Sequence, residues 1–391
     1  MTASRPRDRS ALRVLDYLWR AGPANRVDVI RATELSRATV SKLVGELQAQ
    51  GLVDERRAPV VEAGRAGRPP ALLALNPRIG ALGGVDFDHS SVRVALADLS
   101  GELLLETRRE LDVDNEAEHA INVAVDGVRS LLARAELPRT RLLGVGAAIS
   151  GPVQRDSGSL SADSILPGWS AISLRRELEA RLGVPVHVGN DANLGALAEV
   201  RAGSAQGAAN VVYLMLSSGV GGGLVLDGSL FTGHSGMTGE LGHIPVDPDG
   251  EMCRCGNRGC LETVAGARRL LSGLAAVHGR SLTVERAAGL ARHGDPHCVA
   301  AFRAAGLAAG RVAGSICNVV NPELVIVGGD LIAAGDLLVD AVREGLELTS
   351  LPAVRGDVQV IAATLGDRAQ LLGAVGLAIA EADIAALTSA A

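Results

Sequence analysis

The sequence has 391 residues, which predicts two or three domains at about 150 residues per domain. It is 47% hydrophobic and 21% charged, enough for a sizeable core, yet it has only two Trp, two Tyr and three Phe beside 48 Gly. This composition excludes an aromatic sugar-stacking module and a base-stacking single-strand binder, because both need aromatic platforms. The core must be aliphatic, and the glycines are expected to mark tight turns.

Targeting signals and secreted disulfide patterns are missing from the sequence. No run of about 18 apolar residues could span a bilayer, and the arginine-rich residues 1–10 have no apolar signal core behind them. The five cysteines, three of them within eight positions, do not form a secreted disulfide framework. We therefore expect a soluble, cytoplasmic protein with no membrane partner.

The net charge of -6 is unevenly distributed along the chain. Residues 1–75 carry 13 basic and 8 acidic residues, a local charge of +5, whereas the remainder carries 25 basic and 36 acidic residues, a local charge of −11. A basic head on an acidic body indicates an anionic partner for the head alone, although chance asymmetry remains an alternative until a motif supports it.

The basic head begins with two predicted helices. Residues 11–20 place apolar side chains at helical spacing, and Gly22-Pro23 ends that helix. Asn25 is a fair N-cap for a short second helix over residues 26–32. A three-residue turn follows.

A third helix is predicted over residues 37–50, with Ser36 as its N-cap. Its apolar side chains point inward, and its other face carries short donors and cations near the N-terminus: Arg37, Thr39, Ser41 and Lys42. A helix, a tight turn and a helix that is polar at its start form a helix-turn-helix, whose second helix reads base edges in the major groove.

A basic wing is predicted after the third helix. A strand begins at residues 52–53, and the chain returns over residues 71–75 after an arginine-rich loop. Within that loop, Arg65 and Arg68 are flanked by glycine and proline, which suits insertion into a narrow minor groove. The alternative is a solvated arginine loop, but the turn, cap, wing and charge together favour a winged helix-turn-helix that binds double-stranded DNA.

From residue 79 onward, strands alternate with helices, which predicts a layered α/β body with sites at strand ends. The expected strands are 79–86, 92–98, 103–111, 142–150, 184–190, 210–216 and 222–226, and the expected helices are 116–134 and 192–200. Mostly helical sequence is expected in the last third.

A cysteine-rich loop is the strongest motif in the body. Cys253, Cys255 and Cys260 lie among small residues, and His243 precedes them. A Cys3His set matches the tetrahedral soft-ligand preference of structural zinc, with a redox cluster or coincidence as alternatives. The other two cysteines lie in apolar helical sequence and are expected to be core thiols: Cys298 and Cys317.

Two weaker motifs lie at strand ends. Asp191 follows an apolar strand and opens a helix, so it could accept a proton from a bound hydroxyl or simply be an N-cap. The segment from Ser217 to Gly223 could surround phosphate oxygens or be a plain turn. If a metal fixes the loop, it also fixes Glu240 and Glu262 beside it, which would build a polar wall for a polyol or sugar.

Together these residues resemble the ROK family of repressors, open reading frames and sugar kinases, over essentially the whole chain. The motifs that carry the resemblance are Ser150-Gly151-Pro152-Val153, Pro167-Gly168-Trp169, Asn190-Asp191-Ala192-Asn193, Gly239-Glu240-x-Gly242-His243, Cys253-x-Cys255-Gly256-x-x-Gly259-Cys260-x-Glu262 and Asn321-Pro322-Glu323 with Gly328-Gly329. The form is that of family repressors with a winged helix-turn-helix head.

The resemblance implies an actin-like ATPase fold of two lobes with a sugar in the cleft between them. The expected domains are a head over 1–75 and a body over 76–391, whose lobes span about 76–190 plus the C-terminal helix and about 191–375. The implied sugar ligands are Gly151, Asn190, Asp191, Glu240, His243 and Glu262, and the implied zinc ligands are His243, Cys253, Cys255 and Cys260. A homodimer or homotetramer is implied as well.

One departure from the family pattern concerns the nucleotide. Family kinases carry an Asp-x-Gly-Gly-Thr turn, but here the segment is Asp86-Phe87-Asp88-His89-Ser90, and a Cβ at the former glycines blocks close approach to ATP. Asp88 adds a repulsion of about 4 kcal/mol at 4 Å for an effective dielectric near 20. The vestigial nucleotide residues would be Ser218, Gly219, Gly221, Gly328 and Gly329.

The preferred hypothesis is a DNA-binding transcriptional regulator, most simply a repressor of carbohydrate genes, whose effector is a sugar or sugar phosphate. This reading expects no enzyme activity. The alternative is an ATP-dependent sugar kinase with a DNA-binding head, in which Asp191 would be the catalytic base. A constitutive regulator with a vestigial cleft is the third possibility.

Overall fold

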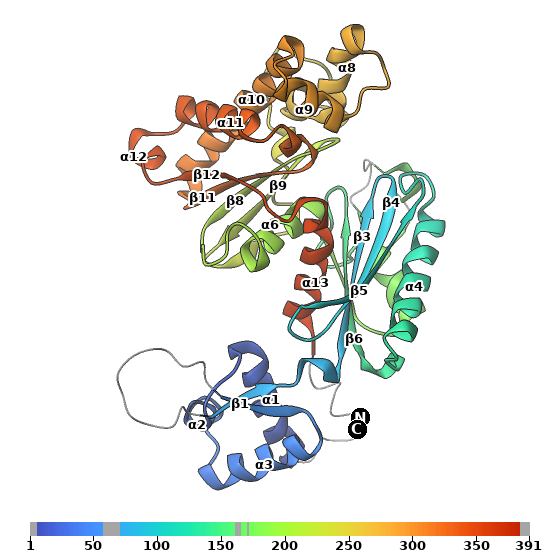
Figure 1. The fold of residues 1–391 in the computed structure, drawn as a ribbon, viewed down its shortest axis with the longest axis vertical. Coiled ribbons are helices and arrows are strands. Elements are labelled where there is room, and N and C mark those ends of the chain that lie inside the picture. Colours follow the sequence, from blue (N-terminus) through green and yellow to red (C-terminus); the bar gives the residue numbers. More distant parts are fainter. Residues whose placement is uncertain (1–5, 58–70, 161–165, 170–171, 384–391) are drawn as a thin grey trace.

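The structure is a computed structural model that describes residues 6–57, 71–160, 166–169 and 172–383. A small N-terminal unit lies at one end of the molecule, and two α/β lobes follow it along the long axis (Figure 1). The predicted wing arginines Arg65 and Arg68 lie outside the described residues. Within the described part of the chain, no helix is both long and apolar enough to cross a membrane.

The head contains three helices and a hairpin, as the sequence predicts. These elements are α1 (Pro6–Ala21), α2 (Arg26–Thr33), α3 (Arg37–Ala49), β1 (Val53–Arg57) and β2 (Ala71–Leu75). The first helix begins five residues earlier than expected. The hairpin is antiparallel, and Ala24 pairs with Leu73 through two backbone hydrogen bonds, so the turn before α2 is joined to the wing.

Both predicted helix caps of the head are present. Asn25 Oδ1 accepts hydrogen bonds from the amides of Val27 and Asp28, at 2.9 and 3.0 Å. Ser36 Oγ accepts the amide of Thr39 at 3.1 Å. Each cap satisfies N–H groups that have no partner inside their helix, and so fixes where α2 and α3 begin.

The first lobe is built on a five-stranded sheet of order β5-β4-β3-β6-β7. Its elements are β3 (Ala81–Asp88), β4 (Ser91–Ala97), β5 (Leu103–Glu110), α4 (Ala117–Arg134), β6 (Leu142–Ile149), α5 (Leu174–Leu182) and β7 (Val186–Asn190). The first three strands form an antiparallel meander, and β6 and β7 run parallel to β3. Helix α4 covers one face of this sheet (Figure 1).

The second lobe repeats this topology with a sheet of order β10-β9-β8-β11-β12, again three antiparallel strands and two parallel ones. Its strands are β8 (Val211–Leu216), β9 (Val220–Leu226), β10 (Ser229–Phe231), β11 (Leu324–Gly328) and β12 (Gln359–Ala362). Its helices are α6 (Asp191–Ala202), α7 (Glu262–Ala265), α8 (Ala267–His278), α9 (Val284–Arg292), α10 (Pro296–Val320), α11 (Asp336–Thr349) and α12 (Pro352–Arg355). The repeated topology is that of the predicted actin-like fold.

The prediction of a mostly helical last third is incomplete. Strands β11 and β12 are separated by helical sequence and were not predicted, nor were α5 and β10. Strand β11 is a five-residue apolar run, and a run of that length is compatible with a buried helix segment as well as with a strand. Its pairing with β8, more than 100 residues earlier in the chain, decides the outcome.

The last helix, α13 (Ala369–Glu381), returns to the first lobe and covers the sheet face opposite α4 (Figure 1). Glycines permit this close packing. A Cβ on Gly146 of β6 would lie 1.8 Å from the carbonyl oxygen of Ala374, and one on Gly373 would lie 2.0 Å from that of Leu194. Some glycines therefore allow helix-to-strand and helix-to-helix contact, in addition to the expected tight turns.

The head shares its hydrophobic core with the first lobe. Four body residues pack in one cluster with the apolar side chains of the head helices: Leu82, Leu99, Leu143 and Ala378. Ala378 and Ile379 lie near the end of α13, whereas Gln370 in its first turn lines the cavity described below. Helix α13 therefore connects that cavity to the head across about 20 Å, the length of 13 helical residues.

Candidate ligand cleft and metal centre

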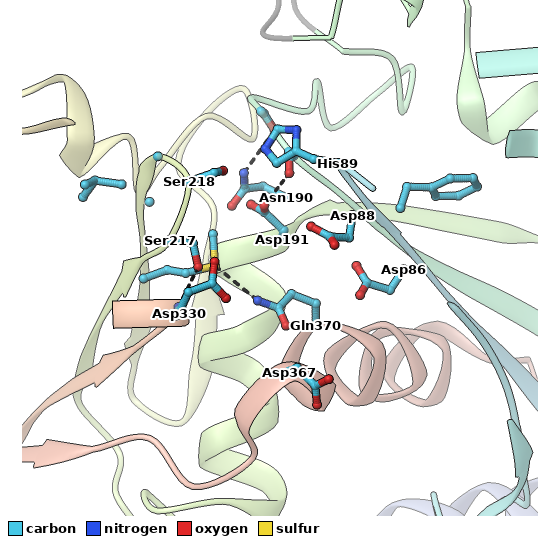
Figure 2. A pocket seen from close by; sticks show the side chains of 18 of the residues that line it. Asp86, Asp88, His89, Asn190, Asp191, Ser217, Ser218, Asp330, Asp367 and Gln370 are labelled. Carbon is cyan, nitrogen blue, oxygen red and sulfur yellow. Dashed lines mark hydrogen bonds between the residues drawn. The ribbon is translucent and has the colours of Figure 1, made fainter. Parts of the chain in front are cut away.

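A polar cavity of about 600 Å³ contains all six predicted sugar ligands. The six are Gly151, Asn190, Asp191, Glu240, His243 and Glu262. The cavity is also lined by residues 86–90, where β3 meets β4, and by residues 217–221 of the glycine loop, where β8 meets β9. Figure 2 shows Asp86 and Asp88 of the first lobe on one side and Ser217, Ser218 and Asp330 of the second lobe on the other, with Asn190 and Asp191 between them. The sequence separations are large, so only the fold brings these residues together.

Asp191 is the first residue of α6, and Asn190 is the N-cap of that helix. The simple N-cap alternative for Asp191 is therefore wrong, because the Asn190 side chain accepts the amide of Asn193 at 3.0 Å. Ser150 Oγ donates to Asp191 Oδ2 at 2.7 Å, and the amide of Ala192 donates to Asp191 Oδ1 at 2.7 Å. These two donors orient the carboxylate at the start of the helix.

Asn190 also ties two segments of the cleft floor together. Its Nδ2 donates to the carbonyl oxygen of Gly151 at 3.1 Å, while its Oδ1 caps α6. The loop that follows β6 is thereby joined to the last residue of β7, which pairs with β6 in parallel. Both residues contribute to the cavity wall, and the amide of Asn190 fixes their spacing.

Four carboxyl groups of the cavity have raised pKa values, and burial is the largest cause in each: Asp86, Asp191, Glu240 and Asp330. Burial, followed by the negative charges of Asp88 and Asp191, raises the pKa of Asp86 to about 8. Burial also raises the pKa of Asp191, against the lowering effect of the Ser150 and Ala192 hydrogen bonds. Burial, with Asp191 and Glu262 nearby, raises the pKa of Glu240 to about 7. The cavity therefore concentrates carboxyl groups that proton donors or hydroxyl groups of a ligand could satisfy.

The predicted metal ligands converge on one point. One donor atom from each of His243, Cys253, Cys255 and Cys260 lies within 4.8 Å of the others. Cys253 Sγ is 3.5 Å from His243 Nδ1, and Cys255 Sγ is 3.6 Å from Cys260 Sγ. Tetrahedral zinc with its usual bond lengths would give edges of about 3.6 Å between S and N and about 3.8 Å between two S atoms. The four residues therefore fit one tetrahedral metal ion.

Backbone geometry holds this cysteine loop in place. The amide of Cys253 donates to Asn257 at 2.7 Å, and that of Gly256 donates to Cys253 at 3.0 Å. Gly259 has a φ of 63°, and a Cβ there would lie 1.6 Å from the carbonyl oxygen of Asp247. Only glycine fits that position, so the glycines of the motif shape the loop that presents the thiols.

The metal cluster and the cavity meet at His243. Its Nδ1 faces Cys253, and its Nε2 lies 3.8 Å from Glu240 Oε2. One ring nitrogen is therefore available to a metal ion while the other faces the cavity. This arrangement is compatible with both roles predicted for His243, since the second nitrogen of a metal-bound histidine commonly contacts a carboxylate.

Glu262 is part of a bridge that the sequence did not predict. Arg254, between two of the metal-ligand cysteines, places Nη2 2.9 Å from Glu262 Oε1, and Glu262 Oε2 accepts the amide of Val220 at 3.2 Å. Glu262 thus joins the cysteine loop to the glycine loop. The position of Arg254 between Cys253 and Cys255 was the available signal, but a single arginine in a loop is usually solvated.

The degenerate turn lies where β3 meets β4. Its residues Asp86, Phe87, Asp88, His89 and Ser90 all line the cavity. His89 Nδ1 is 2.7 Å from Asp114 Oδ1, an ion pair when the ring is protonated. The positions that the resemblance predicts to be glycine in family kinases, Asp88 and His89, therefore carry a carboxylate and an imidazole held against another carboxylate.

The glycine loop that joins β8 to β9 borders the same cavity with Ser218, Gly219 and Gly221. Gly329, which follows β11, lines the cavity as well. Ser217 Oγ accepts the amide of Asp330 at 3.0 Å, which joins this loop to the end of β11. Gly328 does not line the cavity, and a Cβ there would lie 2.3 Å from the Tyr213 hydroxyl. The structure therefore brings four of the five predicted nucleotide residues to the cavity.

The predicted recognition face lies on α3. Arg37, Ser41 and Lys42 are exposed, whereas Thr39 is half-buried, with its hydroxyl 2.8 Å from Ser36 Oγ. The inward face carries Val40 and Leu43, which are buried. Three of the four predicted side chains are thus free of the head's core, and Thr39 belongs to the helix cap.

Several cavity residues were missed by the sequence reasoning. They are Arg93, Arg108, Asp330, Asp367 and Gln370. Arg93 lies on β4 and Arg108 on β5. Arg93 forms an ion pair with Asp367, two residues before the start of α13. Nothing local in the sequence indicates that strands of the first lobe and the C-terminal helix meet at one cavity.

Comparisons with known proteins agree with this architecture. A ROK family model matches residues 82–381, and a MarR family model matches residues 7–65. The chain is 28% identical to the xylose repressor of Caldicellulosiruptor bescii over 91% of this chain and 92% of that protein. It is 33% identical to the glucokinase of Thermotoga maritima over 75% of this chain and 96% of the enzyme.

Among solved structures, the fold matches a ROK family transcriptional regulator described as a homologue of the Escherichia coli MLC protein. The TM-score is 0.77 and the identity 27%, over 98% of each chain. The repressor matches thus include the head, whereas the glucokinase match spans three quarters of the chain. With a MarR-type winged helix at its N-terminus and a body that matches the family model over 300 residues, the chain belongs to the ROK family.

Proposed function

We propose that this protein is a DNA-binding transcriptional repressor that responds to a sugar held in the cavity between its lobes. The observation that carries the proposal is that one chain has a helix-turn-helix head with an exposed polar face on α3 and a cavity lined by all six residues predicted to bind sugar. The whole-chain relatives named above support it, because one is a xylose repressor and another a transcriptional regulator.

The head supplies the DNA contacts. Helix α3 enters the major groove with Arg37, Ser41 and Lys42 outward, and the arginines of the wing, Arg65 and Arg68, reach the minor groove. The excess positive charge of residues 1–75 supports binding to phosphate as well as to bases. We propose a homodimer or homotetramer, because two heads related by symmetry can bind an inverted repeat.

The charge of the cavity favours an uncharged sugar over a sugar phosphate. Seven carboxyl groups other than Asp367 line the cavity: Asp86, Asp88, Asp191, Glu240, Glu262, Glu285 and Asp330. Each arginine that lines it is already in an ion pair, namely Arg93 with Asp367, Arg108 with Glu110 and Arg254 with Glu262. A phosphate would meet repulsion there without a free cation to offset it.

The Cys3His cluster is proposed to hold structural zinc, coordinated by His243, Cys253, Cys255 and Cys260. Zinc would supply a rigid tetrahedral cross-link rather than catalysis, because four protein ligands leave no open position for water. The ring of His243 is then fixed, and Glu240 is held beside its second nitrogen. The metal therefore positions the wall of carboxylates that recognises sugar hydroxyl groups.

Helix α13 is proposed to carry the signal from the cavity to the head. Its first turn lines the cavity with Gln370, and its last turns pack in the core that the head shares with the first lobe. Lobe closure around a sugar would move α13 and so change the spacing of two DNA-binding heads. The sugar must bind the two arrangements with different affinity, otherwise it shifts nothing.

The test is a mobility-shift titration of full-length protein on an operator selected from random duplexes, with and without sugars. Xylose, glucose and N-acetylglucosamine are compared with glucose 6-phosphate. An uncharged sugar should change the operator Kd at least about tenfold, a coupling of about 1.4 kcal/mol. If no sugar changes DNA affinity although calorimetry detects sugar binding, the cavity does not regulate the head.

The second candidate is an ATP-dependent sugar kinase, favoured by Asp191 in a buried, oriented position and by the glucokinase relative. We infer that the chain does not turn over, because Asp88 and His89 stand where kinase relatives need glycine backbone against phosphate. An ADP-release assay over hexoses and N-acetylhexosamines decides between the two. Turnover that Asp191→Asn abolishes would establish the kinase reading instead.

A further inference from the structure

A second group of metal-ligating side chains lies in the helical part of the second lobe. His278 is the last residue of α8, Asp295 caps the N-terminus of α10, and Cys298 lies in the first turn of that helix. One donor atom from each lies within 4.8 Å of the others. Helix α8 starts beside the cysteine loop and is about 18 Å long, so this group is remote from the Cys3His cluster.

The separations within this group match the edges of a metal tetrahedron. His278 Nε2 is 3.2 Å from Asp295 Oδ1 and 3.7 Å from Cys298 Sγ. Zinc with its usual bond lengths would give edges of about 3.3 Å between N and O and about 3.6 Å between N and S. The edges of the Cys3His cluster, 3.5 and 3.6 Å, are similar.

Hydrogen bonds link the three side chains through Asp295, whose carboxylate accepts from His278 and from the Cys298 thiol. His278 Nε2 also faces Cys298 Sγ, so one nitrogen, one oxygen and one sulfur lie around a common point. Asp295 Oδ1 already accepts the amide of Cys298 at 2.9 Å, which fixes the carboxylate relative to the thiol. A metal ion between the three donors would use the imidazole, the carboxylate and the buried sulfur at the same time.

We propose that His278, Asp295 and Cys298 form a second zinc site, independent of the proposed function of the cleft. Imidazole, carboxylate and thiolate together suit zinc, and binding replaces the Cys298 thiol proton, which is released to solvent. The His278 and Asp295 side chains are 16% and 22% exposed, so a water can complete the tetrahedron. The ion would join the end of α8 to the start of α10 across α9.

The proposal is tested by counting metal ions in the full-length protein. The chain is stripped with chelator under reducing conditions, equilibrated with excess Zn²⁺, desalted and analysed by elemental mass spectrometry. We expect about two zinc ions per wild-type chain and about one in His278→Gln and in Cys298→Ala. The matched control is His293→Gln, which changes an exposed histidine between α9 and α10 and should keep about two ions.

A second measurement separates metal loss from unfolding. Cobalt replaces zinc, and its thiolate charge-transfer absorption reports both sites, so His278→Gln should lose the contribution of the single Cys298 thiolate and keep that of the three thiolates of the Cys3His cluster. The thermal midpoint of the wild-type chain should rise when the second ion binds, and that of His278→Gln should not. The proposal is overturned by one zinc ion per wild-type chain at saturation, or by two ions retained in both ligand variants.

Discussion

His243 Nε2 lies 3.8 Å from Glu240 Oε2, while the other ring nitrogen of His243 faces the cysteine cluster. A single imidazole therefore stands between the metal centre and the cavity. Because a metal-bound imidazole cannot rotate, metal binding would hold the His243 ring in a single orientation beside Glu240. With the proposed zinc bound, this contact would make the geometry of the proposed sugar wall depend on a metal that does not itself touch the ligand.

Glu240→Gln should weaken sugar binding without removing metal. Above pH 8, where a carboxyl group with a pKa of about 7 is mostly ionised, a hydrogen bond from a sugar hydroxyl to this charged group contributes about 1.5–3 kcal/mol, so the sugar Kd should rise roughly 10- to 100-fold. Calorimetry gives the Kd, and elemental analysis gives the metal content. Loss of zinc in Glu240→Gln would mean that the carboxylate supports the metal site rather than the ligand.

Cys255→Ser should lose zinc and sugar response while DNA affinity without sugar is kept. The cysteine loop is far along the chain from the head, whose core contacts only the first lobe and α13 among the described residues. Metal analysis and a mobility shift on the same preparation check this. Equal loss of zinc and of DNA binding would show that the head depends on the metal for folding.

The degenerate turn gives a gain-of-function prediction. Restoring glycine with Asp88→Gly and His89→Gly removes a carboxylate and two Cβ atoms from the phosphate side of the cavity. We expect affinity for a non-hydrolysable ATP analogue to rise at least about tenfold, which is less than the full repulsion of about 4 kcal/mol. Calorimetry checks it, with Ser90→Ala as the control in the same turn. Unchanged affinity would place the obstacle to nucleotide elsewhere.

The raised pKa of Asp86 predicts how stability depends on pH. The folded-state pKa of about 8 exceeds the ordinary 3.8, so the folded protein binds more protons than the unfolded chain between these values. The contribution of Asp86 to stability must therefore fall as pH rises from about 4 to 8. Asp86→Asn should flatten that fall and raise the free energy of unfolding at pH 8 by on the order of 1–3 kcal/mol.

Denaturant unfolding at several pH values checks the Asp86 prediction. The control is Asp126→Asn, whose side chain on α4 is 78% exposed and should leave the pH profile unchanged. If Asp86→Asn is destabilising at pH 8 and keeps the wild-type slope, the carboxylate is ionised and stabilised by a partner in the folded state.

More of the head's structure than of the body's could be predicted from the sequence. Caps at Asn25 and Ser36 and the apolar faces between them are local signals, so the three head helices follow from the sequence. The proposed metal site was also predictable from a local signal, because three cysteines within eight residues have few functions other than binding a metal ion. By contrast, Arg254 bridging to Glu262, and Gln370 reaching the cavity from α13, depend on contacts between distant segments. Periodicity and spacing carry no information about such contacts.

Helix α13 should be required for coupling rather than for sugar binding. Ile379→Ala trims a side chain that packs between α13 and the head's core, and we expect the sugar Kd to stay within about twofold while the effect of sugar on DNA binding shrinks severalfold. The control is Leu182→Ala, another partly buried side chain in the first lobe. If both variants retain full coupling, the signal does not pass through the end of α13.

The account's central claim is that sugar in the cavity controls DNA affinity of the head. The most direct measurement is the operator Kd of the full-length, zinc-loaded protein by fluorescence anisotropy, with increasing uncharged sugar and, separately, its phosphate. We predict that one uncharged sugar changes the Kd at least about tenfold and that its phosphate acts only at much higher concentration. A Kd that is identical with and without every sugar that binds the cavity would contradict the account.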